Sequence, residues 1–578
     1  MKEQIKDLIN QALDQAKKDT RLPDFVLGEE IQIEHPQLTE HGDYATNIAL
    51  KLAKIVKLKP VAVAELVVEE ILKLKEVKKN FSSVRVNRPG FINFIFSKDY
   101  LVDQANQVKK LKDKFGGGSL GAGQTVVIDY SSPNIAKPMH VGHLRSTVIG
   151  DSLYRLAKFL DYKTISDNHI GDWGTQFGLL LYAYKNFGDK KKVEKDPINE
   201  LNKLYIDASQ QAKDDKKIKA AGKAEFKKLE DGDPENKELW LWFTEVSMKK
   251  FETAYQLLGI NKFDYVLGES FYEDKMSREF DELLEKGIAK KDPDHSIYVD
   301  LEPYKLGRCI LVKSDGATTY HLRDIATYRY RLEEFKFDQN LYVVDFRQSH
   351  HFLQLFKVLE LMGLPEVDQS FHVSFGMLKL PSGSTMSTRE GNLVELELLI
   401  KEGVEKAQKV ISEKNPNLKN KDEVARQIAV GAIKYADLSH NRETDIIFDW
   451  DKYLQFEGNT GPYLQYTHAR IKSILSKTDF KFSKINPDHL TGKEEIALLR
   501  KLYIFPEIVQ QAFEDYLPSL IANYLFQLAS DFNLFYNNLP VLKADDKIKK
   551  ARLNLAAAVA QILKNGLDLL GIEAPEEM

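Results

Sequence analysis

Cysteine is nearly absent from this chain, since Cys309 is the only one among 578 residues. A single cysteine excludes a disulfide within the chain and any cluster of cysteines around a metal, and it fits a reducing compartment. No apolar run approaches the roughly 20 residues that a membrane-spanning helix needs. Residues 1–18 have the spacing of an amphipathic helix rather than the apolar core of a secretion signal. We therefore expect a cytoplasmic protein with no membrane partner.

An excess of charge is also lacking, because the net charge is only −4. Such a balance argues weakly against a nucleic-acid partner, although a large enzyme can concentrate its positive charge on one surface. Hydrophobic residues make up 43% and charged residues 29% of the chain, as in ordinary globular proteins. At this length the chain exceeds a single hydrophobic core, so we expect three or four domains.

The first 112 residues predict a small α+β domain. Helical spacing at 1–18, 45–56 and 61–74 alternates with a short strand at 30–36 and paired strands within 84–97. The glycine-rich segment 113–124 then breaks the pattern, and we interpret it as a linker. A glycine-rich run can also cradle a phosphate, but this one precedes a strand instead of joining a strand to a helix.

Residues 125–400 predict an α/β domain, a Rossmann-like doubly wound parallel sheet. Strand-like runs at 125–130, 309–313 and 341–345 are each followed by helical spacing, at 142–162, 320–335 and 351–364. A charged, mostly helical stretch at about 180–305 has the character of an insertion. The segments 401–454 and 455–578 are helical throughout, with no internal repeat.

The loop and helix start in "SSPNIAKPMHVGHLRSTVIGD", residues 131–151, favour phosphate chemistry. His140 and His143 fall in the first turn of a helix that follows the first strand, where backbone amides bind anions, and Gly142 between them allows close approach. Imidazole donors here suit displacement at the α-phosphorus of ATP, and Lys137 adds a positive charge. A metal pair or a capped helix with incidental histidines are the alternatives. We expect no zinc, because the H-E-x-x-H spacing is missing.

Several long motifs, in order, resemble arginyl-tRNA synthetases, a class I family of aminoacyl-tRNA synthetases. "HVGH" resembles the HIGH motif of the class, and "SSPNIAKPMHVGHLRST", "HIGDWGTQFG" and "FEGNTGPYLQYTHAR" are similar to this family, as are "GDYATN", "RPGFINF" and "ILKNGLDLLGI". The resemblance covers essentially the whole chain. It implies ligation of L-arginine to tRNA(Arg) with ATP and Mg²⁺, through arginyl-adenylate, releasing AMP and pyrophosphate. It also implies that activation of arginine waits for bound tRNA.

The second ATP motif of the class departs from its usual form in this chain. Where a KMSKS loop is expected, the sequence reads "GSTMSTREGN", so that Thr385 and Thr388 replace the two lysines. The resemblance assigns Met386 and Ser387 of this loop to ATP binding, and we expect Arg389 to share the positive charge with Lys137. By the same resemblance His351 lies near the adenosine, although a polar helix start explains it equally well.

Recognition of arginine requires hydrogen-bond acceptors, because a guanidinium carries five donors and stays charged. Tyr320 and Asp324 are four residues apart and therefore share a helix face. The resemblance adds Asp129, Asn134 and Gln348 to this arginine-binding set, with Glu269 as a weaker candidate. Without the resemblance, a surface ion pair between Asp324 and a neighbouring arginine is the simpler interpretation.

The resemblance also assigns the outer domains to tRNA. Residues 1–112 correspond to a domain that contacts the tRNA, 401–454 to a region that contacts the tRNA stem, and 455–578 to an anticodon-binding domain. Candidate tRNA-binding residues are Tyr463, Tyr466, Phe91 and Asn93, the last two of which could equally be structural. Most C-terminal aromatics at helical spacing are expected in the core. We expect a monomer.

Three other functions remain open from the sequence. A synthetase for another amino acid is disfavoured by the acceptor-rich set of candidate side chains, which suits a cation. An RNA-binding paralogue that has lost catalysis would have to carry its defect in the loop at 385–392, because the motifs around His140 are intact. A metal-dependent hydrolase is the least favoured of the three.

Overall fold

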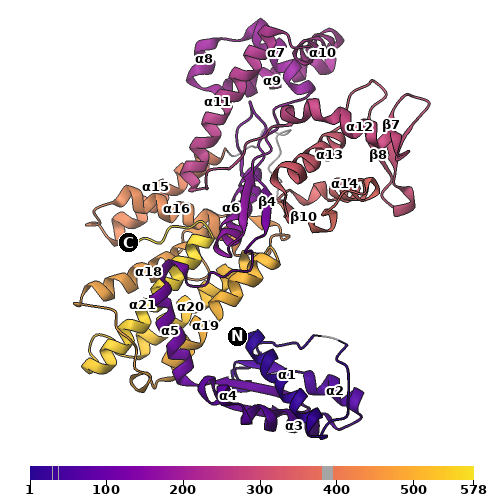
Figure 1. The fold of residues 1–578 in the computed structure, drawn as a ribbon. Helices are drawn as coiled ribbons and strands as arrows, with labels where there is room; N and C mark the ends of the chain where they lie inside the picture. Colours follow the sequence, from indigo (N-terminus) through magenta and orange to yellow (C-terminus); the bar gives the residue numbers. More distant parts are fainter. Residues whose placement is uncertain (29, 37, 380–394) are drawn as a thin grey trace. The chain divides into compact units, whose positions relative to one another are not determined.

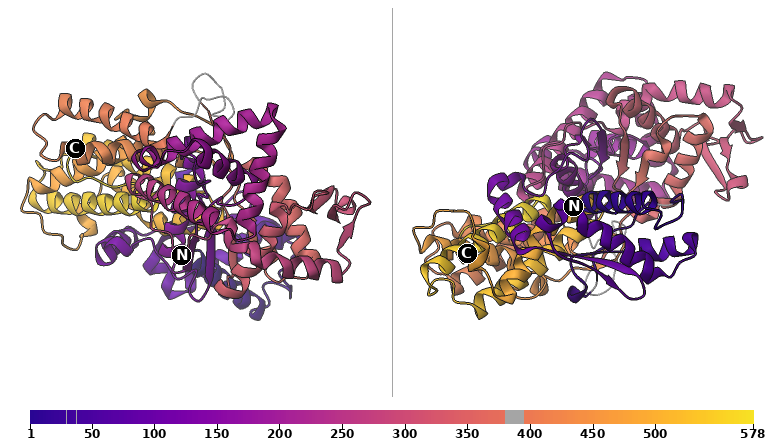
Figure 2. Two further views of the ribbon diagram at one scale, coloured as in Figure 1. Left: turned by 90° about the horizontal axis from the view of Figure 1, so that it is seen from above. Right: turned by 60° about the horizontal axis from the view of Figure 1, so that its bottom comes forward.

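The computed structural model describes residues 1–28, 30–36, 38–379 and 395–578. These residues pack into two compact units. Unit 1 consists of Met1–Phe115, Ile471–Phe505 and Leu528–Ile562, and unit 2 of Gly116–Arg470, Pro506–Gln527 and Leu563–Met578. Both units therefore include residues of the C-terminal helices α18 (Gly461–Ser476), α19 (Lys493–Glu514), α20 (Ser519–Asn538) and α21 (Asp546–Leu569), whose course can be followed by colour in Figure 2.

The N-terminal part of unit 1 is an α+β fold. Its elements are α1 (Lys2–Lys18), β1 (Tyr44–Thr46), α2 (Ile48–Val56), α3 (Pro60–Lys73), α4 (Lys75–Asn80), β2 (Phe81–Asn87), β3 (Phe91–Phe96) and α5 (Lys98–Leu111). The strands form an antiparallel sheet in the order β1-β3-β2. Helix α1 buries the apolar stripe expected of an amphipathic helix. The strand expected at 30–36 is wrong: this segment makes only an isolated bridge between Glu34 and Ala45.

A four-stranded parallel sheet lies at the centre of unit 2. It consists of β4 (Thr125–Asp129), β5 (Lys163–Asp167), β9 (Gln339–Tyr342) and β10 (Ser370–His372), in the order β10-β9-β4-β5. Helix α6 (Val141–Phe159) connects β4 to β5, and the chain then crosses to β9 on the other side of β4. The strand order therefore reverses between β4 and β9, the position at which such sheets bind ligands beyond the carboxyl ends of their strands. The predicted Rossmann-like fold is confirmed.

One predicted strand belongs to a different sheet. Residues 309–313 fall largely in β8 (Arg308–Val312), which pairs with β7 (Ile297–Asp300) in an antiparallel sheet that also contains β6 (Ala289–Lys291). The strand is confirmed, but its assignment to the parallel sheet is wrong. A short apolar run followed by a helix has the same appearance in both settings, because strand periodicity does not record the partner. The parallel sheet uses β5 instead, which the sequence analysis did not single out.

Helices carry most of the remaining residues of the central domain. They are α7 (Thr175–Phe187), α8 (Lys190–Lys195), α9 (Pro197–Asp214), α10 (Lys216–Glu230), α11 (Pro234–Leu258), α12 (Met276–Glu285), α13 (Tyr320–Tyr330) and α14 (Ser349–Met362). In Figure 1, α7 to α10 form a cluster, and the long helix α11 leads from it toward α15 (Leu396–Lys414). Helix α13 ends in a π-helical turn, Arg331–Phe335.

The C-terminal region is mostly helical, but the expectation that 401–454 is helical throughout is wrong at residues 446–447, which form a short strand. Its elements are β11 (Leu378–Lys379), α15 (Leu396–Lys414), α16 (Lys421–Leu438), β12 (Ile446–Ile447), α17 (Trp450–Tyr453), α18 (Gly461–Ser476), α19 (Lys493–Glu514), α20 (Ser519–Asn538) and α21 (Asp546–Leu569). Most of the late aromatic side chains are buried, which confirms the core interpretation: Tyr503, Phe505, Phe513, Tyr524, Phe532 and Phe535. In the described part of the chain, no helix combines the length and the apolar composition needed to cross a membrane.

Candidate active site

The two histidines of the loop after β4 cap helix α6. His140 is the N-cap residue, and its Nδ1 accepts a hydrogen bond of 3.0 Å from the backbone N–H of Gly142. Nδ1 of His143 accepts one of 3.2 Å from the backbone N–H of His140. The two rings lie 4.0 Å apart between centroids. The two histidines therefore form the cap themselves, and the cap fixes the orientation of both imidazoles at a helix N-terminus.

Both imidazoles are neutral at physiological pH. Burial, with the positive charges of Lys137 and Arg347, lowers the pKa of His140 to about 4. Burial, together with His140 and Lys137, lowers the pKa of His143 to about 3. A neutral imidazole carries one N–H, and in each ring Nδ1 is the acceptor, so the proton resides on Nε2. The helix start thus carries two neutral Nε2–H donors.

Gly142 is required by the ring that folds over it. A Cβ at this position would lie 2.7 Å from both Cε1 and Nδ1 of His140, closer than a carbon side chain can approach. Any other residue at 142 would displace the imidazole or its hydrogen bond. The cap geometry therefore explains why a glycine stands between His140 and His143.

Lys137 supplies the positive charge beside the histidines. Its Nζ donates a 3.0 Å hydrogen bond to Oε1 of Gln176 and lies 5.0 Å from the centroid of the Tyr205 ring. Burial lowers the pKa of Lys137. Its influence on the pKa of both histidines confirms that the three side chains are close together.

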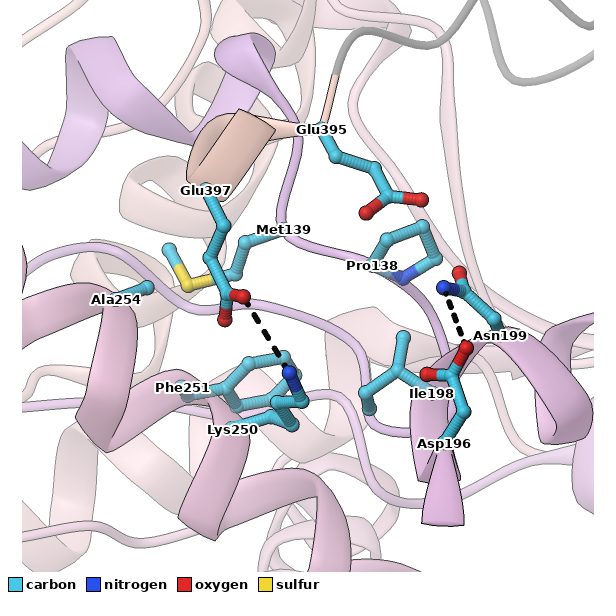
Figure 3. Close-up of a pocket in the computed structure, with 10 residues that line it drawn as sticks. All are labelled: Pro138, Met139, Asp196, Ile198, Asn199, Lys250, Phe251, Ala254, Glu395 and Glu397. Carbon is cyan, nitrogen blue, oxygen red and sulfur yellow. Dashed lines mark hydrogen bonds and ion pairs between the residues drawn. The ribbon is translucent and has the colours of Figure 1, made fainter. Parts of the chain in front are cut away.

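The predicted ATP-binding residues Met386 and Ser387, and the predicted cation Arg389, lie outside the described residues, as do Thr385 and Thr388. Glu395, the first residue described after this segment, forms an antiparallel bridge with His140, and Leu396 N–H donates to the Met139 carbonyl. The residues that follow this segment therefore lie directly beside the loop between β4 and α6, which leads to the two histidines. Figure 3 shows the pocket at this junction, where Pro138 and Met139 face Glu397 and Lys250.

A buried charge cluster joins the carboxyl ends of β4 and β5. Asp129 and Asp167 are paired across these strands, and the guanidinium of Arg331 bridges them, at 2.7 Å from Asp129 Oδ2 and 2.9 Å from Asp167 Oδ2. Arg331 is fully buried. The second oxygen of Asp129 accepts from the Ser132 hydroxyl at 3.0 Å. Asp129, expected to bind substrate, is thus already held by an arginine of the protein itself, which the sequence analysis did not identify.

Asn134 lies in the loop that follows β4, five residues after Asp129. It forms a parallel bridge with Gly171 of the "HIGDWG" segment, and a Cβ on Gly171 would lie 2.1 Å from Asn134 Oδ1. The close approach of these two segments explains the glycine. It also connects the loop after β4 with His169, which is near enough to Asp324 to lower the pKa of its carboxyl group.

Helices α13 and α14 bring Asp324, Tyr320 and His351 together. His351 Nε2 lies 2.6 Å from Asp324 Oδ2, and the rings of Tyr320 and His351 are 4.8 Å apart. Burial alone would raise the pKa of Asp324, but the hydrogen bond and charge of His351 lower it below its usual value. Gln348 is the exposed residue before α14. The structure therefore places His351, predicted near adenosine, against the candidate arginine-binding residues.

The surroundings of Asp324 are rich in carboxylates. The neighbouring Arg323 pairs with Glu269 at 3.3 Å and with Glu273, so the alternative pairing of Asp324 with a neighbouring arginine is wrong. Burial raises the pKa of Glu269, and Asp324 and Asp172 raise it further while Arg323 opposes them. A carboxyl group whose pKa is raised by neighbouring carboxylates lies in a site that attracts a cation.

The candidate tRNA-binding residues differ in exposure. Tyr466 on α18 is 37% exposed, with the Arg470 guanidinium 4.7 Å from its ring centroid, and Tyr463 is half-buried, 5.7 Å from the Phe526 ring. Phe91 is 38% exposed. Asn93 is 2% exposed and donates to the His41 carbonyl, which supports its structural interpretation. Within the described residues, no three histidine, cysteine or carboxylate side chains are arranged to hold a metal ion.

Three family models match the chain in succession. The family described as "Arginyl tRNA synthetase N terminal domain" matches residues 3–96. The family "tRNA synthetases class I (R), catalytic domain" matches residues 106–450, more than half of the chain. The family "DALR anticodon binding domain" matches residues 464–578.

Individual relatives match over nearly their full length. An arginine–tRNA ligase of Alkaliphilus metalliredigens is 42% identical over 548 residues, covering 94% of this chain and 95% of the relative. An arginine–tRNA ligase of Clostridium botulinum strain Okra is 41% identical over 574 residues, covering 99% and 100%. The solved structure of the Thermus thermophilus arginyl-tRNA synthetase covers 100% of both chains, with a TM-score of 0.83 at 25% identity.

Proposed function

This chain belongs to the arginyl-tRNA synthetases of class I, and we propose that His140, His143 and Lys137 bind the phosphates of ATP in the reaction of that family. The enzyme joins L-arginine to tRNA(Arg) through arginyl-adenylate, with release of AMP and pyrophosphate. One observation carries the proposal: both histidines accept backbone hydrogen bonds at Nδ1, so each presents a neutral N–H at Nε2.

Neutral donors and one buried cation suit the chemistry at the α-phosphorus. When the arginine carboxylate attacks, negative charge grows on the phosphate oxygens, and donors fixed in advance stabilise it without reorganising. Lys137 contributes a full charge in a partly buried setting, where Coulomb interactions are stronger than in water. We place Gly142 in the same ATP-binding group, because it leaves room for the His140 ring.

Mg²⁺ enters this proposal as a companion of ATP. Imidazoles held as neutral donors, beside a lysine, suit phosphate oxygens rather than a metal ion, so we assign Mg²⁺ to the phosphates and water. When bound there, Mg²⁺ neutralises phosphate charge. We also assign Met386, Ser387 and Arg389 to the proposed ATP site, although these three lie outside the described residues.

For arginine, we propose that Asp324 pairs with the guanidinium. Its hydrogen bond to His351 keeps it ionised, and a planar cation with five donors fits a carboxylate better than a lysine ammonium does. Tyr320 and Gln348 supply further polar contacts, with Glu269 as an additional acceptor. Asn134 and Asp129 are assigned to the α-amino side, with Asp129 using lone pairs that Arg331 and Ser132 leave free. In this proposal His351 contributes to arginine binding by orienting Asp324, and it also lies next to the adenosine site.

For tRNA, we propose contacts through Phe91 in the N-terminal domain (1–112) and through Tyr463 and Tyr466 in the anticodon-binding domain (455–578). Exposed aromatic rings can stack on unpaired bases, and Arg470 beside Tyr466 adds a charge for phosphate. The linker at 113–124, the catalytic domain at 125–400 and the stem-contact region at 401–454 complete the proposed organisation. We further propose a cytoplasmic monomer in which bound tRNA is needed for activation of arginine.

Substitution of each histidine by Asn and by Gln tests the phosphate-binding role. Asn places an acceptor near the position of Nδ1, which preserves the helix cap, but it removes the donor at Nε2. Gln reaches the position of Nε2 with an N–H. We expect His143→Asn to fold with a melting temperature close to wild type and to lose about 10²-fold in kcat for arginine-dependent pyrophosphate exchange. His143→Gln should retain more activity than His143→Asn. Wild-type kcat in the Asn variant would show that Nε2 makes no contact in the transition state.

A further inference from the structure

One face of the long helix α11 is directed at the loop that carries the proposed ATP-binding residues. Ser247, Lys250, Phe251, Ala254 and Tyr255 recur at the three- and four-residue spacing of a single helix face. In Figure 3, Lys250, Phe251 and Ala254 lie opposite Pro138 and Met139 of that loop. In the sequence, α11 lies within the charged stretch interpreted as an insertion, and no motif in it indicated a part in catalysis.

The loop that this face meets has an unfavourable backbone conformation. Ser131, Ser132 and Ala136 have positive φ values of 75°, 47° and 59°. Residues with a Cβ rarely adopt this region, and such strain persists only where the surrounding structure holds the residue in place. Lys137 directly follows the last of these residues. The conformation that delivers Lys137 therefore has to be maintained from outside the loop.

Ser247 holds one end of the loop. Its Oγ accepts a 2.9 Å hydrogen bond from the backbone N–H of Ala136 and donates to the Phe243 carbonyl of its own helix at 2.6 Å. Ser247 is 0% and Ala136 3% exposed. Without the serine hydroxyl, the Ala136 N–H would lose this acceptor in a place that water reaches poorly.

Tyr255 holds the other end. Its hydroxyl lies 2.7 Å from Ser131 Oγ and accepts from Asn168 Nδ2 at 3.1 Å, while Asn168 Oδ1 accepts from the Ser132 N–H at 3.0 Å. Ser131 Oγ in turn lies 2.9 Å from Thr147 Oγ1, which donates to the His143 carbonyl at 2.7 Å. One phenol thus connects α11 with both strained serines and with the first turn of the histidine helix.

We propose that α11 is a positioning helix, in which Ser247 and Tyr255 hold residues 131–136 in the strained conformation that places Lys137 and the histidines for reaction. The proposal rests on the proposed role of Lys137. A third contact of α11 also supports the loop. Lys250 pairs with Glu397 at 3.3 Å, at the start of α15. The residue before Glu397, Leu396, donates its backbone N–H to the carbonyl of Met139 in the loop. Neither Ser247 nor Tyr255 is assigned a contact with substrate.

Ser247→Ala and Tyr255→Phe test this proposal, with Thr253→Ala as the matched control. Thr253 lies on the same helix and donates to the carbonyl four residues earlier, as Ser247 does, but it is exposed and away from the loop. The readouts are kcat and KM in arginine-dependent pyrophosphate exchange with tRNA present, and the melting temperature. We expect Ser247→Ala and Tyr255→Phe each to lower kcat about tenfold, and Thr253→Ala to leave it unchanged. The isosteric Tyr255→Phe keeps the ring, so it reports on the hydroxyl even if Ser247→Ala folds poorly.

Combination with Lys137→Ala separates positioning from a purely structural role. If Ser247 acts by placing Lys137, the double variant should be within about twofold of Lys137→Ala alone, because the positioned group is already absent. Full multiplication of the two losses would overturn the proposal, as would kcat values for Ser247→Ala and Tyr255→Phe equal to that of Thr253→Ala. Wild-type kcat in Lys137→Ala alone would instead refute the proposed role of the lysine.

Discussion

Gly142→Ala should stabilise helix α6 and yet damage the enzyme. In the interior of a helix, alanine is favoured over glycine by about 1 kcal/mol, and somewhat less in the first turn. The added Cβ, however, would lie 2.7 Å from two ring atoms of His140, about 1 Å inside ordinary contact. The imidazole must therefore move, and it gives up its 3.0 Å hydrogen bond from residue 142. A displacement of about 1 Å at a reacting centre can cost roughly 10²-fold in rate.

Pyrophosphate exchange and thermal unfolding measure the two effects in the same preparation. We expect kcat to fall by about 10- to 100-fold with a melting temperature equal to or above that of the wild type. The double variant Gly142→Ala/His140→Ala should be no slower than His140→Ala, because the displaced ring is then missing. A Gly142→Ala enzyme with normal kcat would refute the reasoning that the glycine exists to accommodate the ring.

Four further outcomes follow from the same geometry. Lys137→Ala should lower kcat for pyrophosphate exchange about 10²-fold or more, and a near-normal kcat would remove the lysine from the ATP site. Asp324→Asn should raise KM for arginine about 10²-fold and leave KM for ATP within about threefold, since a half-buried acceptor of the guanidinium loses its charge; parallel changes in both constants would contradict this assignment. The pKa values of His140 and His143, about 4 and about 3 in the folded chain against their usual 6.5, mean that the unfolded chain binds more protons between these values. The free energy of unfolding should therefore fall as pH drops from about 6.5 toward 4, and urea titrations should show a shallower fall in His143→Asn. Arg331→Met should lower the free energy of unfolding by about 3–5 kcal/mol, because two buried aspartates lose their partner; urea unfolding at neutral pH measures this, and a change below about 1 kcal/mol would contradict it.

The sequence predicted the part of the fold that carries the histidines because its signals there are local. The apolar run at 125–130, the helical spacing after 142 and a glycine between two histidines all lie within a few dozen residues. The strand at 309–313 shows the limit of such signals: its residues form β8, but the partner that decides its sheet lies in a hairpin whose pairing the sequence does not record. The segment at 30–36 alternates like a strand yet finds a partner only at Glu34.

The candidate site was less predictable where it depends on distant residues. Arg331 is 202 residues from Asp129 and 164 from Asp167, and it enters through a π-helical turn at the end of α13 that no sequence pattern indicated. The resemblance placed His351 near adenosine, which stays a prediction, and no sequence pattern indicated its hydrogen bond to Asp324 across two helices. The capping role of the histidines, by contrast, could be considered from their place at a helix start, although not their tautomer.

The contribution of α11 illustrates the same limit. Its sequence is that of an amphipathic helix in a charged region, and Ser247 and Tyr255 carry no motif. Only the positive φ values of Ser131, Ser132 and Ala136 show that the loop needs external support. Backbone strain of this kind cannot be read from the residue types, because serine and alanine have no preference for that region.

The most direct test of the account is pyrophosphate exchange into ATP with L-arginine, L-lysine or no amino acid, each with and without total tRNA. Exchange with arginine alone, and only in the presence of tRNA, is the predicted result, since Asp324 and its neighbours suit a planar cation and tRNA is proposed to complete the site. Comparable exchange with lysine, or none with arginine in the presence of tRNA, would contradict the account.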